Sequence, residues 1–313
     1  MTNNICDQND GDCHNLVVNN VKNYGPPNCC YRLWGPVDLI KDGPNTVLVH
    51  GSVIPLRSML HKIDRPNNFL YLTKYLPTKL CPFLQDDCKQ HNIWSFEYAD
   101  EDVAGLGYVN YESLATYGKR LCDAIKKVKI ESQNDTVNII AHSMGGLIAR
   151  YAAQNMQDGK VNKIITLDTG HLGFGLAGII DNLLKLNTLP EYPKTEVQCS
   201  IDAAPKSEFA QKLTDAFANH NYELVSLAAE DGFGGLEIEI VEELLGIKSG
   251  SLKGIVVADW SSSSMGQVDD NRQPTNVNCN IKFEIMNAVN HLTIALIRNK
   301  NDAVYERIIN NLH

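Results

Sequence analysis

The stretch Val137–Gln154, which reads VNIIAHSMGGLIARYAAQ, constrains the fold of this chain more than any other. It begins with a short apolar run, Val137–Ile140, whose β-branched residues predict a buried parallel strand. A turn of small residues follows, and the apolar spacing after Gly145 predicts a helix. A strand, a sharp turn with a serine at its tip and a helix together form the context of a nucleophile elbow. We therefore expect Ser143 to project from the carboxyl edge of a parallel sheet.

The string AHSMGG resembles the elbow of α/β-hydrolase lipases and esterases, with Ala141 in place of the first glycine. Two further motifs resemble the same superfamily in the same order. VLVHG at 47–51 resembles the strand and loop that carry the oxyanion hole, and VNHLTI at 289–294 resembles the loop that carries the base. The resemblance covers roughly residues 46–292. It implies an α/β-hydrolase fold, with a mostly parallel central sheet flanked by helices.

The order of predicted elements favours the same class, because strands that alternate with helices build parallel sheets with right-handed crossovers. Residues 1–45 are rich in Asn, Asp, Gly, Pro and Cys, and we expect an irregular lead-in with an edge strand near Tyr31–Trp34. The α/β domain is expected over 46–313. By resemblance, residues 174–220 hold a lid or cap between the sixth and seventh strands, and a plain core helix is the alternative there. The remaining strands are expected at 46–49, 93–98, 161–167, 224–228 and 281–286, and helices at 68–88, 110–130, 206–218 and 302–312.

A serine nucleophile needs a histidine to accept its proton and an acid to orient that histidine. His291 lies just past the last predicted strand, where the base loop of this fold belongs, and we expect it to be the base. His171 is expected beside the site and His220 at the surface. By resemblance, the backbone N–H groups of Ser52 and Met144 form the oxyanion hole.

The acid is displaced from its usual place. In bacterial-type lipases it follows the seventh strand, and the matching position here is Lys253, a cation that cannot accept a proton from imidazole. Asp168 follows the sixth strand instead, and its stretch TLDTG resembles the GLDPA of pancreatic-type lipases. We expect Asp168 to be the acid, with Asp231 and Asp259 as the open alternatives.

These residues predict a serine carboxylic-ester hydrolase, a lipase or esterase, that acts on small-molecule or lipid esters through a Ser143–Asp168–His291 triad and an acyl-enzyme. No metal or organic cofactor is expected, since no Cys/His spacing indicates zinc. A thioesterase, a phospholipase, an acyltransferase or a deacylase of amide- or inositol-linked lipids would use the same residues. Lys253 favours one further alternative, a catalytically dead binding protein on the hydrolase scaffold.

Composition limits the partners. A net charge of −9 argues against nucleic acid or an anionic membrane as an electrostatic partner. The apolar runs are shorter than the ~20 residues of a membrane span, so only a transient lipid contact through the lid is expected. The start MTNNICDQND has no secretory signal, which leaves both a cytoplasmic protein and a secreted one with its signal removed. Of nine Cys, the first four and the Cys81/Cys88 pair lie where disulfides can form, and Cys122 is expected inside a helix.

Overall fold

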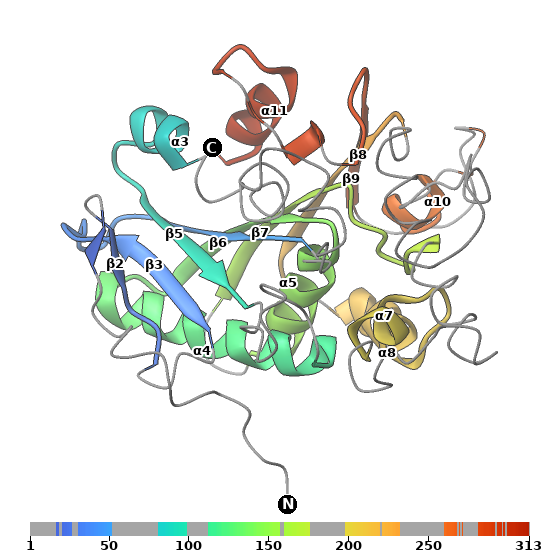
Figure 1. Ribbon diagram of the computed structural model, residues 1–313, viewed down its shortest axis with the longest axis horizontal. Helices are drawn as coiled ribbons and strands as arrows, with labels where there is room; N and C mark the ends of the chain where they lie inside the picture. The colour runs from blue at the N-terminus through green and yellow to red at the C-terminus, as the bar shows by residue number, and fades with distance from the viewer. Residues whose placement is uncertain are drawn as a thin grey trace, which may run out of the picture.

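One sheet with helices on both faces organises the chain in the computed structural model (Figure 1). Helices α4 and α5 cover one face, and α3 and α11 cover the other. The structure describes residues 17–18, 21–26, 31–51, 81–98, 112–156, 160–175, 198–219, 221–231, 260–267, 269, 271, 281–291, 293–295, 297 and 299–312.

The described strands form a nine-stranded sheet in the order β1-β2-β3-β5-β4-β6-β7-β8-β9. Strands β4 to β9 run parallel. The remaining pairs are antiparallel: β1 pairs with β2, β2 with β3, and β3 with β5. The carboxyl ends of the parallel strands therefore meet at one edge, where loops of distant sequence come together. The bounds are β1 Val17–Val18, β2 Val21–Asn23, β3 Arg32–Pro36, β4 Asn45–Val49, β5 Asn92–Glu97, β6 Thr136–His142, β7 Lys160–Leu167, β8 Glu223–Ala229 and β9 Ile281–Met286.

Alternation along the strands divides the core into two apolar layers. In β4, Val47 and Val49 pack into the layer beneath α4 and α5, while Leu48 points into the layer beneath α3 and α11. Successive side chains of a strand point to opposite faces, so a strand covered on both faces must be apolar at consecutive positions. The continuous apolar runs of the sequence have this cause.

Helix α4, Leu114–Ser132, corresponds to the helix expected at 110–130, and its apolar residues form a stripe along one side. Leu114, Tyr117, Leu121, Ile125 and Val128 are buried against the sheet. Ser113 caps its first turn by accepting a hydrogen bond from the Thr116 N–H, and Gln133 ends it in a left-handed conformation.

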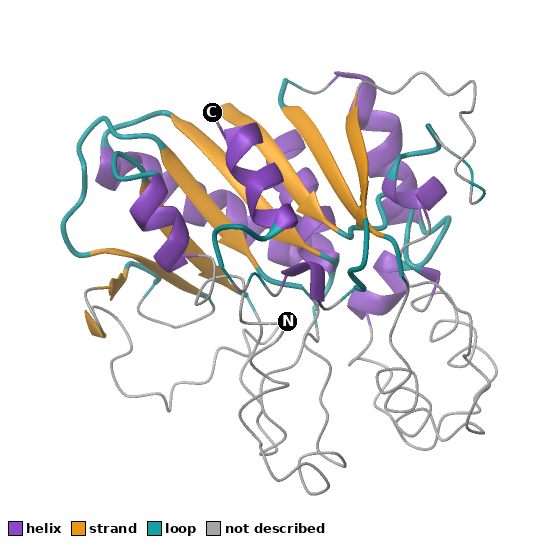
Figure 2. Ribbon diagram, turned by 90° about the horizontal axis from the view of Figure 1, so that it is seen from above, coloured by secondary structure: helices purple, strands orange, loops and turns teal. Residues whose placement is uncertain are grey.

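The helices lie in two layers, which Figure 2 shows from above on either side of the strands. Tyr151 of α5 stacks on Phe209 of α8, and Phe83 of α3 contacts Tyr305 of α11. The other described helices are α3 Cys81–Asp87, α5 Met144–Asn155, α7 Gln198–Ala203, α8 Glu208–Asp215, η2 Ala216–Asn219, α10 Trp260–Ser263, η3 Thr293–Ala295 and α11 Ala303–Leu312.

Two expectations need correction. Strands β1 to β3 lie within residues 1–45 and belong to the main sheet, and β3 is not its edge because β2 pairs with its free side. Cys88 is a buried free thiol and so forms no disulfide with Cys81, whereas Cys122 is buried inside α4 as expected.

The segment expected to hold a lid divides into two parts. Residues 176–197 lie outside the described residues. The described part, α7 and α8, packs on the scaffold, since Asp202 accepts a hydrogen bond from the Leu114 N–H and Arg150 donates to the Leu213 carbonyl. These two helices therefore pack beside α4 and α5, and the lid stays a prediction.

Candidate active site

Ser143 stands at a strained turn between β6 and α5. Its φ of 52° and ψ of −130° lie outside the regions that residues with a side chain usually occupy. The turn is held on both sides, because the Ser143 N–H donates to the Leu167 carbonyl at 2.9 Å and the Thr169 hydroxyl donates to the Ser143 carbonyl at 2.8 Å. The elbow thus carries Ser143 at the carboxyl edge of the sheet and at the start of a helix, as its sequence indicated.

Asp168 follows the neighbouring strand β7 and is also held in a left-handed conformation, with a φ of 48°. Its N–H donates to the Leu227 carbonyl at 2.7 Å. One carboxylate oxygen, Oδ1, accepts a hydrogen bond from the Ala229 N–H at 2.9 Å. These contacts join Asp168 to the end of β8 and aim its second oxygen toward the base loop.

His291 lies in the loop after β9 and meets that second oxygen. The distance from His291 Nδ1 to Asp168 Oδ2 is 2.6 Å, and both side chains are buried. An imidazole bonded to a carboxylate at Nδ1 keeps its proton there and presents Nε2 as the acceptor. The structure therefore brings Asp168 and His291 together in the arrangement that a general base requires.

The base loop is braced by the segment that follows β8. The Glu230 carboxylate accepts a hydrogen bond from the Ala288 N–H at 3.0 Å, where Ala288 has a φ of 57°. The Asp231 N–H donates to the Val289 carbonyl, and the Asp231 side chain is exposed. The two residues after β8 thus hold the base loop, Glu230 through its side chain and Asp231 through its backbone.

The other predicted site residues are placed unevenly. Met144 is the first residue of α5, and the first N–H groups of a helix have no acceptor within it. His171 is buried three residues after Asp168. Ser52, His220, Lys253 and Asp259 lie outside the described residues.

The end of β4 lies directly against the elbow. A side-chain carbon at Gly51 would be 2.9 Å from His142 Nδ1 and 3.0 Å from Ser143 Cβ, so the backbone there passes close to both. His50 is structural, because its Nδ1 contacts the Gly51 carbonyl at 2.7 Å and its ring stacks on Tyr98. The loop after β4 therefore begins beside Ser143, where an oxyanion hole is needed.

Buried Arg150 supports the loop that follows Asp168, called the acid loop below. Arg150, two turns after Ser143 in α5, donates to the His171 carbonyl at 3.0 Å and to the Leu213 carbonyl at 2.9 Å. Burial, with the Arg150 charge adding to it, lowers the pKa of His171 well below its usual value. His171 is therefore neutral, and its ring nitrogen Nε2 lies 3.1 Å from the Thr166 hydroxyl.

Four contributing residues carry no recognisable signal in the sequence: His142, Arg150, Thr169 and Glu230. His142 Nε2 lies 2.8 Å from the His291 carbonyl oxygen, 149 positions away along the chain. Thr169 and Glu230 likewise act through backbone groups of another segment. A sequence pattern carries a signal for residues near each other on one element, and it carries none for such long-range contacts to backbone.

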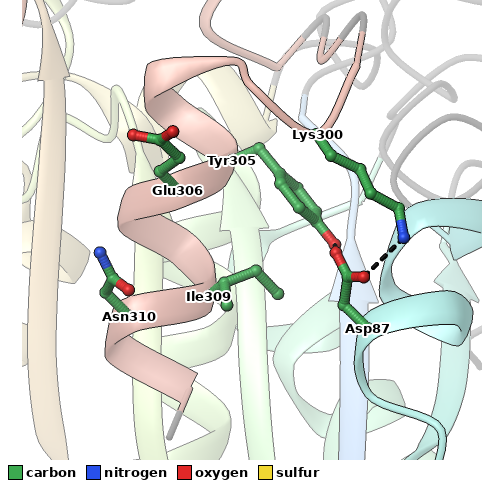
Figure 3. A pocket seen from close by; sticks show the side chains of 6 residues that line it. All are labelled: Asp87, Lys300, Tyr305, Glu306, Ile309 and Asn310. Carbon is green, nitrogen blue, oxygen red and sulfur yellow. Dashed lines mark hydrogen bonds and ion pairs between the residues drawn. The ribbon is translucent and has the colours of Figure 1, made fainter.

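A separate surface hollow of about 310 Å³ lies beside α11 (Figure 3). In it Asp87 accepts hydrogen bonds from Lys300 at 2.5 Å and from Tyr305 at 2.6 Å. The Tyr305 contact joins α3 to α11, and the Lys300 contact joins α3 to the turn before α11. The hollow shares no residue with the Ser143 site. Within the described part of the chain, no three His, Cys, Asp or Glu side chains gather in a group that could hold a metal ion.

Comparison with known proteins decides the family. The sequence profile of the PGAP1-like alpha/beta domain matches residues 84–299, well over half of the chain. The chain belongs to this family. The part that matches the PGAP1-like domain includes Ser143, Asp168 and His291, whereas β4 precedes it.

A shorter stretch of this PGAP1-like chain resembles Triacylglycerol lipase 2 of Saccharomyces cerevisiae, with 31% identity over 90 residues. The match covers 28% of this chain and 27% of the yeast protein, so it spans about a quarter of that relative's length.

Solved structures confirm the expected α/β-hydrolase fold. The mature Bacillus licheniformis lipase BlEst2 superposes with a TM-score of 0.50 and 13% identity, over 90% of this chain and 97% of that one. Phospholipase PlaB from Legionella pneumophila superposes with a TM-score of 0.52 and 15% identity, over 85% and 58%. At such identities the likeness concerns the fold alone. Among the helices described in this PGAP1-like domain, none combines the length and apolarity needed to cross a bilayer.

Proposed function

We propose that this PGAP1-like chain is a serine ester hydrolase in which Ser143 is the nucleophile, His291 the base and Asp168 the acid. The observation that carries the proposal is the 2.6 Å contact between Asp168 Oδ2 and His291 Nδ1. That contact is buried at the sheet edge where the strained turn of Ser143 stands. The family and the match to a yeast lipase support ester hydrolysis as the reaction.

The proposed reaction has two steps. Ser143 attacks the carbonyl carbon of an ester while His291 Nε2 accepts the serine proton, and Asp168 stabilises the imidazolium that forms. The Met144 N–H, with the Ser52 N–H as the expected second donor, stabilises the oxyanion. His291 then protonates the leaving alcohol. In the second step it deprotonates a water molecule that hydrolyses the acyl-enzyme.

The same parts explain why Ser143 is placed at a turn. A serine hydroxyl at the start of α5 lies near the positive end of the helix dipole, which favours the negative charge that develops during attack. The strained turn is the geometry by which a nucleophile elbow exposes its serine at the top of the sheet. Two hydrogen bonds hold that geometry in place: the Thr169 hydroxyl donates to the Ser143 carbonyl, and the Ser143 N–H donates to the Leu167 carbonyl.

The test combines an active-site label with substrate turnover. The wild-type chain should react rapidly and stoichiometrically with a fluorophosphonate, and Ser143→Ala should not react at all. A panel of p-nitrophenyl esters with short to long acyl chains then distinguishes an esterase from a lipase. A folded wild-type chain that neither takes the label nor hydrolyses any ester would contradict the proposal. It would favour the catalytically dead binding protein, the alternative that Lys253 at the usual acid position suggested.

A further inference from the structure

The side chain of His142, the last residue of β6, contacts the main chain of His291, the proposed base. Its Nε2 atom lies 2.8 Å from the carbonyl oxygen of His291, and the two rings have centroids 5.0 Å apart. A carbonyl oxygen can only accept a hydrogen bond, so Nε2 of His142 must carry a proton. The residue immediately before the nucleophile therefore donates to the backbone of the base.

The surroundings of His142 keep its imidazole neutral. The side chain is buried, and its other nitrogen, Nδ1, faces the backbone at Gly51, where a side-chain carbon would lie only 2.9 Å away. Burial lowers the pKa of His142 to about 3, the nearby imidazoles of His291 and His50 act in the same direction, and the hydrogen bond to the His291 carbonyl opposes them. A neutral imidazole adds no second positive charge beside His291 when that residue accepts the serine proton.

We propose, on the basis of the proposed function, that His142 is a positioning residue that holds the base loop by donating its Nε2–H to the His291 carbonyl. Asp168 fixes the His291 ring at Nδ1, and His142 fixes the His291 main chain. The base is thereby held at both ends. Since Ser143 directly follows His142, the same residue links the backbone of the nucleophile to the backbone of the base.

The proposal makes a chemical demand that a simple packing role does not. Position 142 needs a hydrogen-bond donor at the place of Nε2, and it needs neither acid–base chemistry nor a charge. Glutamine can supply such a donor from its amide, whereas methionine has a similar length and shape but no donor. Phenylalanine matches the ring of histidine and also lacks a donor. These three substitutions separate the hydrogen bond from the volume of the side chain.

The experiment measures fluorophosphonate labelling and p-nitrophenyl ester hydrolysis in wild type, His142→Gln and His142→Met. Because small displacements of a catalytic group cost on the order of 10²-fold in rate, we expect kcat to fall ~10–100-fold in His142→Met. KM should change little, and kcat of His142→Gln should stay near that of wild type. His142→Phe repeats the comparison should the methionine variant not fold. Equal kcat values for the donor and the non-donor variants of equal thermal stability would overturn the proposal.

A second measurement does not depend on turnover. In Ser143→Ala, the proton between His291 Nδ1 and Asp168 should give a low-field NMR resonance, and adding His142→Met should broaden it by faster exchange with water. Adding His142→Gln should leave it sharp. An unchanged resonance in the methionine variant would contradict the positioning role. If wild type takes no label, the proposed function fails, whereas rapid labelling of wild type and His142→Met alike makes only this inference fail.

Discussion

The Asp168 carboxylate and the His291 imidazole meet at 2.6 Å although 123 positions separate them along the chain. The carboxylate comes from the end of β7, and the imidazole comes from the loop after β9, two strands away. Asp168 spans the intervening strand by accepting the Ala229 N–H with its other oxygen. A carboxylate at the end of β7 can therefore reach a histidine in the loop after β9.

This contact predicts that the acid function belongs to Asp168. Asp168→Asn should lower kcat by about 10⁴-fold, because the amide cannot stabilise the imidazolium and favours the wrong tautomer of His291. The matched control is Asp231→Asn, whose exposed side chain should leave kcat within about twofold of wild type. Ester hydrolysis at saturating substrate measures both values. A normal rate for Asp168→Asn together with a large loss for Asp231→Asn would reverse the assignment.

The strained backbone at Ser143 predicts a trade-off in which the residue needed for activity lowers the stability of the fold. Ser143→Gly should be inactive but about 1 kcal/mol more stable than Ser143→Ala, since glycine adopts a φ of 52° without steric cost and alanine does not. The control pair is Lys127→Gly and Lys127→Ala, on the exposed side of α4. There the glycine variant should be about 1 kcal/mol less stable than the alanine variant, because glycine is unfavourable inside a helix. Urea unfolding of the four variants gives the comparison. Equal stabilities for the two Ser143 variants would mean that the turn stores no strain.

The close contact between α5 and the acid loop predicts that substitutions at Gly146 and Thr169 have coupled effects on stability. A side-chain carbon at Gly146 would lie 2.2 Å from the Thr169 hydroxyl oxygen, so Gly146→Ala should cost about 1–3 kcal/mol of stability. Thr169→Gly removes the obstructing atoms, and in that background the same substitution should cost less. A double-mutant cycle by chemical denaturation measures this coupling. Strict additivity would show that the clash is relieved elsewhere.

Buried neutral histidines predict that stability is lost in acid. Burial holds the pKa of His142 at about 3, whereas an unfolded histidine has a pKa of roughly 6.5. Between these values the unfolded chain binds more protons than the folded one, so the free energy of unfolding rises with pH by up to ~1.4 kcal/mol per pH unit for this group. Its contribution is complete above about pH 6.5 and is lost as the pH falls toward 3.

The comparison with His142→Gln isolates that contribution. The variant cannot take up this proton, so its free energy of unfolding should approach that of wild type, or exceed it, as the pH falls from 7 to 5. Urea titrations of both proteins at each pH provide the measurement. Parallel pH profiles for the two proteins would show that His142 is not a buried neutral group.

The elements that the sequence predicted well are those whose signals are local. The apolar stripe of α4, the run before Ser143 and the alternation around β9 each depend on residues within a few positions of one another. Such periodicity follows from the geometry of helices and strands and needs no tertiary contact. Strands β1 to β3 are short, and their place in the sheet depends on the antiparallel pairing of β3 with β5, more than fifty residues later. Residues 1–45 accordingly looked irregular.

For the candidate site, the sequence indicates the candidate residues but not how they combine in space. The AHSMGG turn and the position of His291 after a strand were readable because the elbow and the base loop have local motifs. The choice of Asp168 over Asp231 depended on the resemblance of TLDTG to the stretch of pancreatic-type lipases, since both residues follow a strand and both are carboxylates. Only the tertiary structure buries one against His291 and exposes the other. It also places the His142 ring against the His291 carbonyl, a contact that depends on how β6 and the loop after β9 meet at one edge of the sheet.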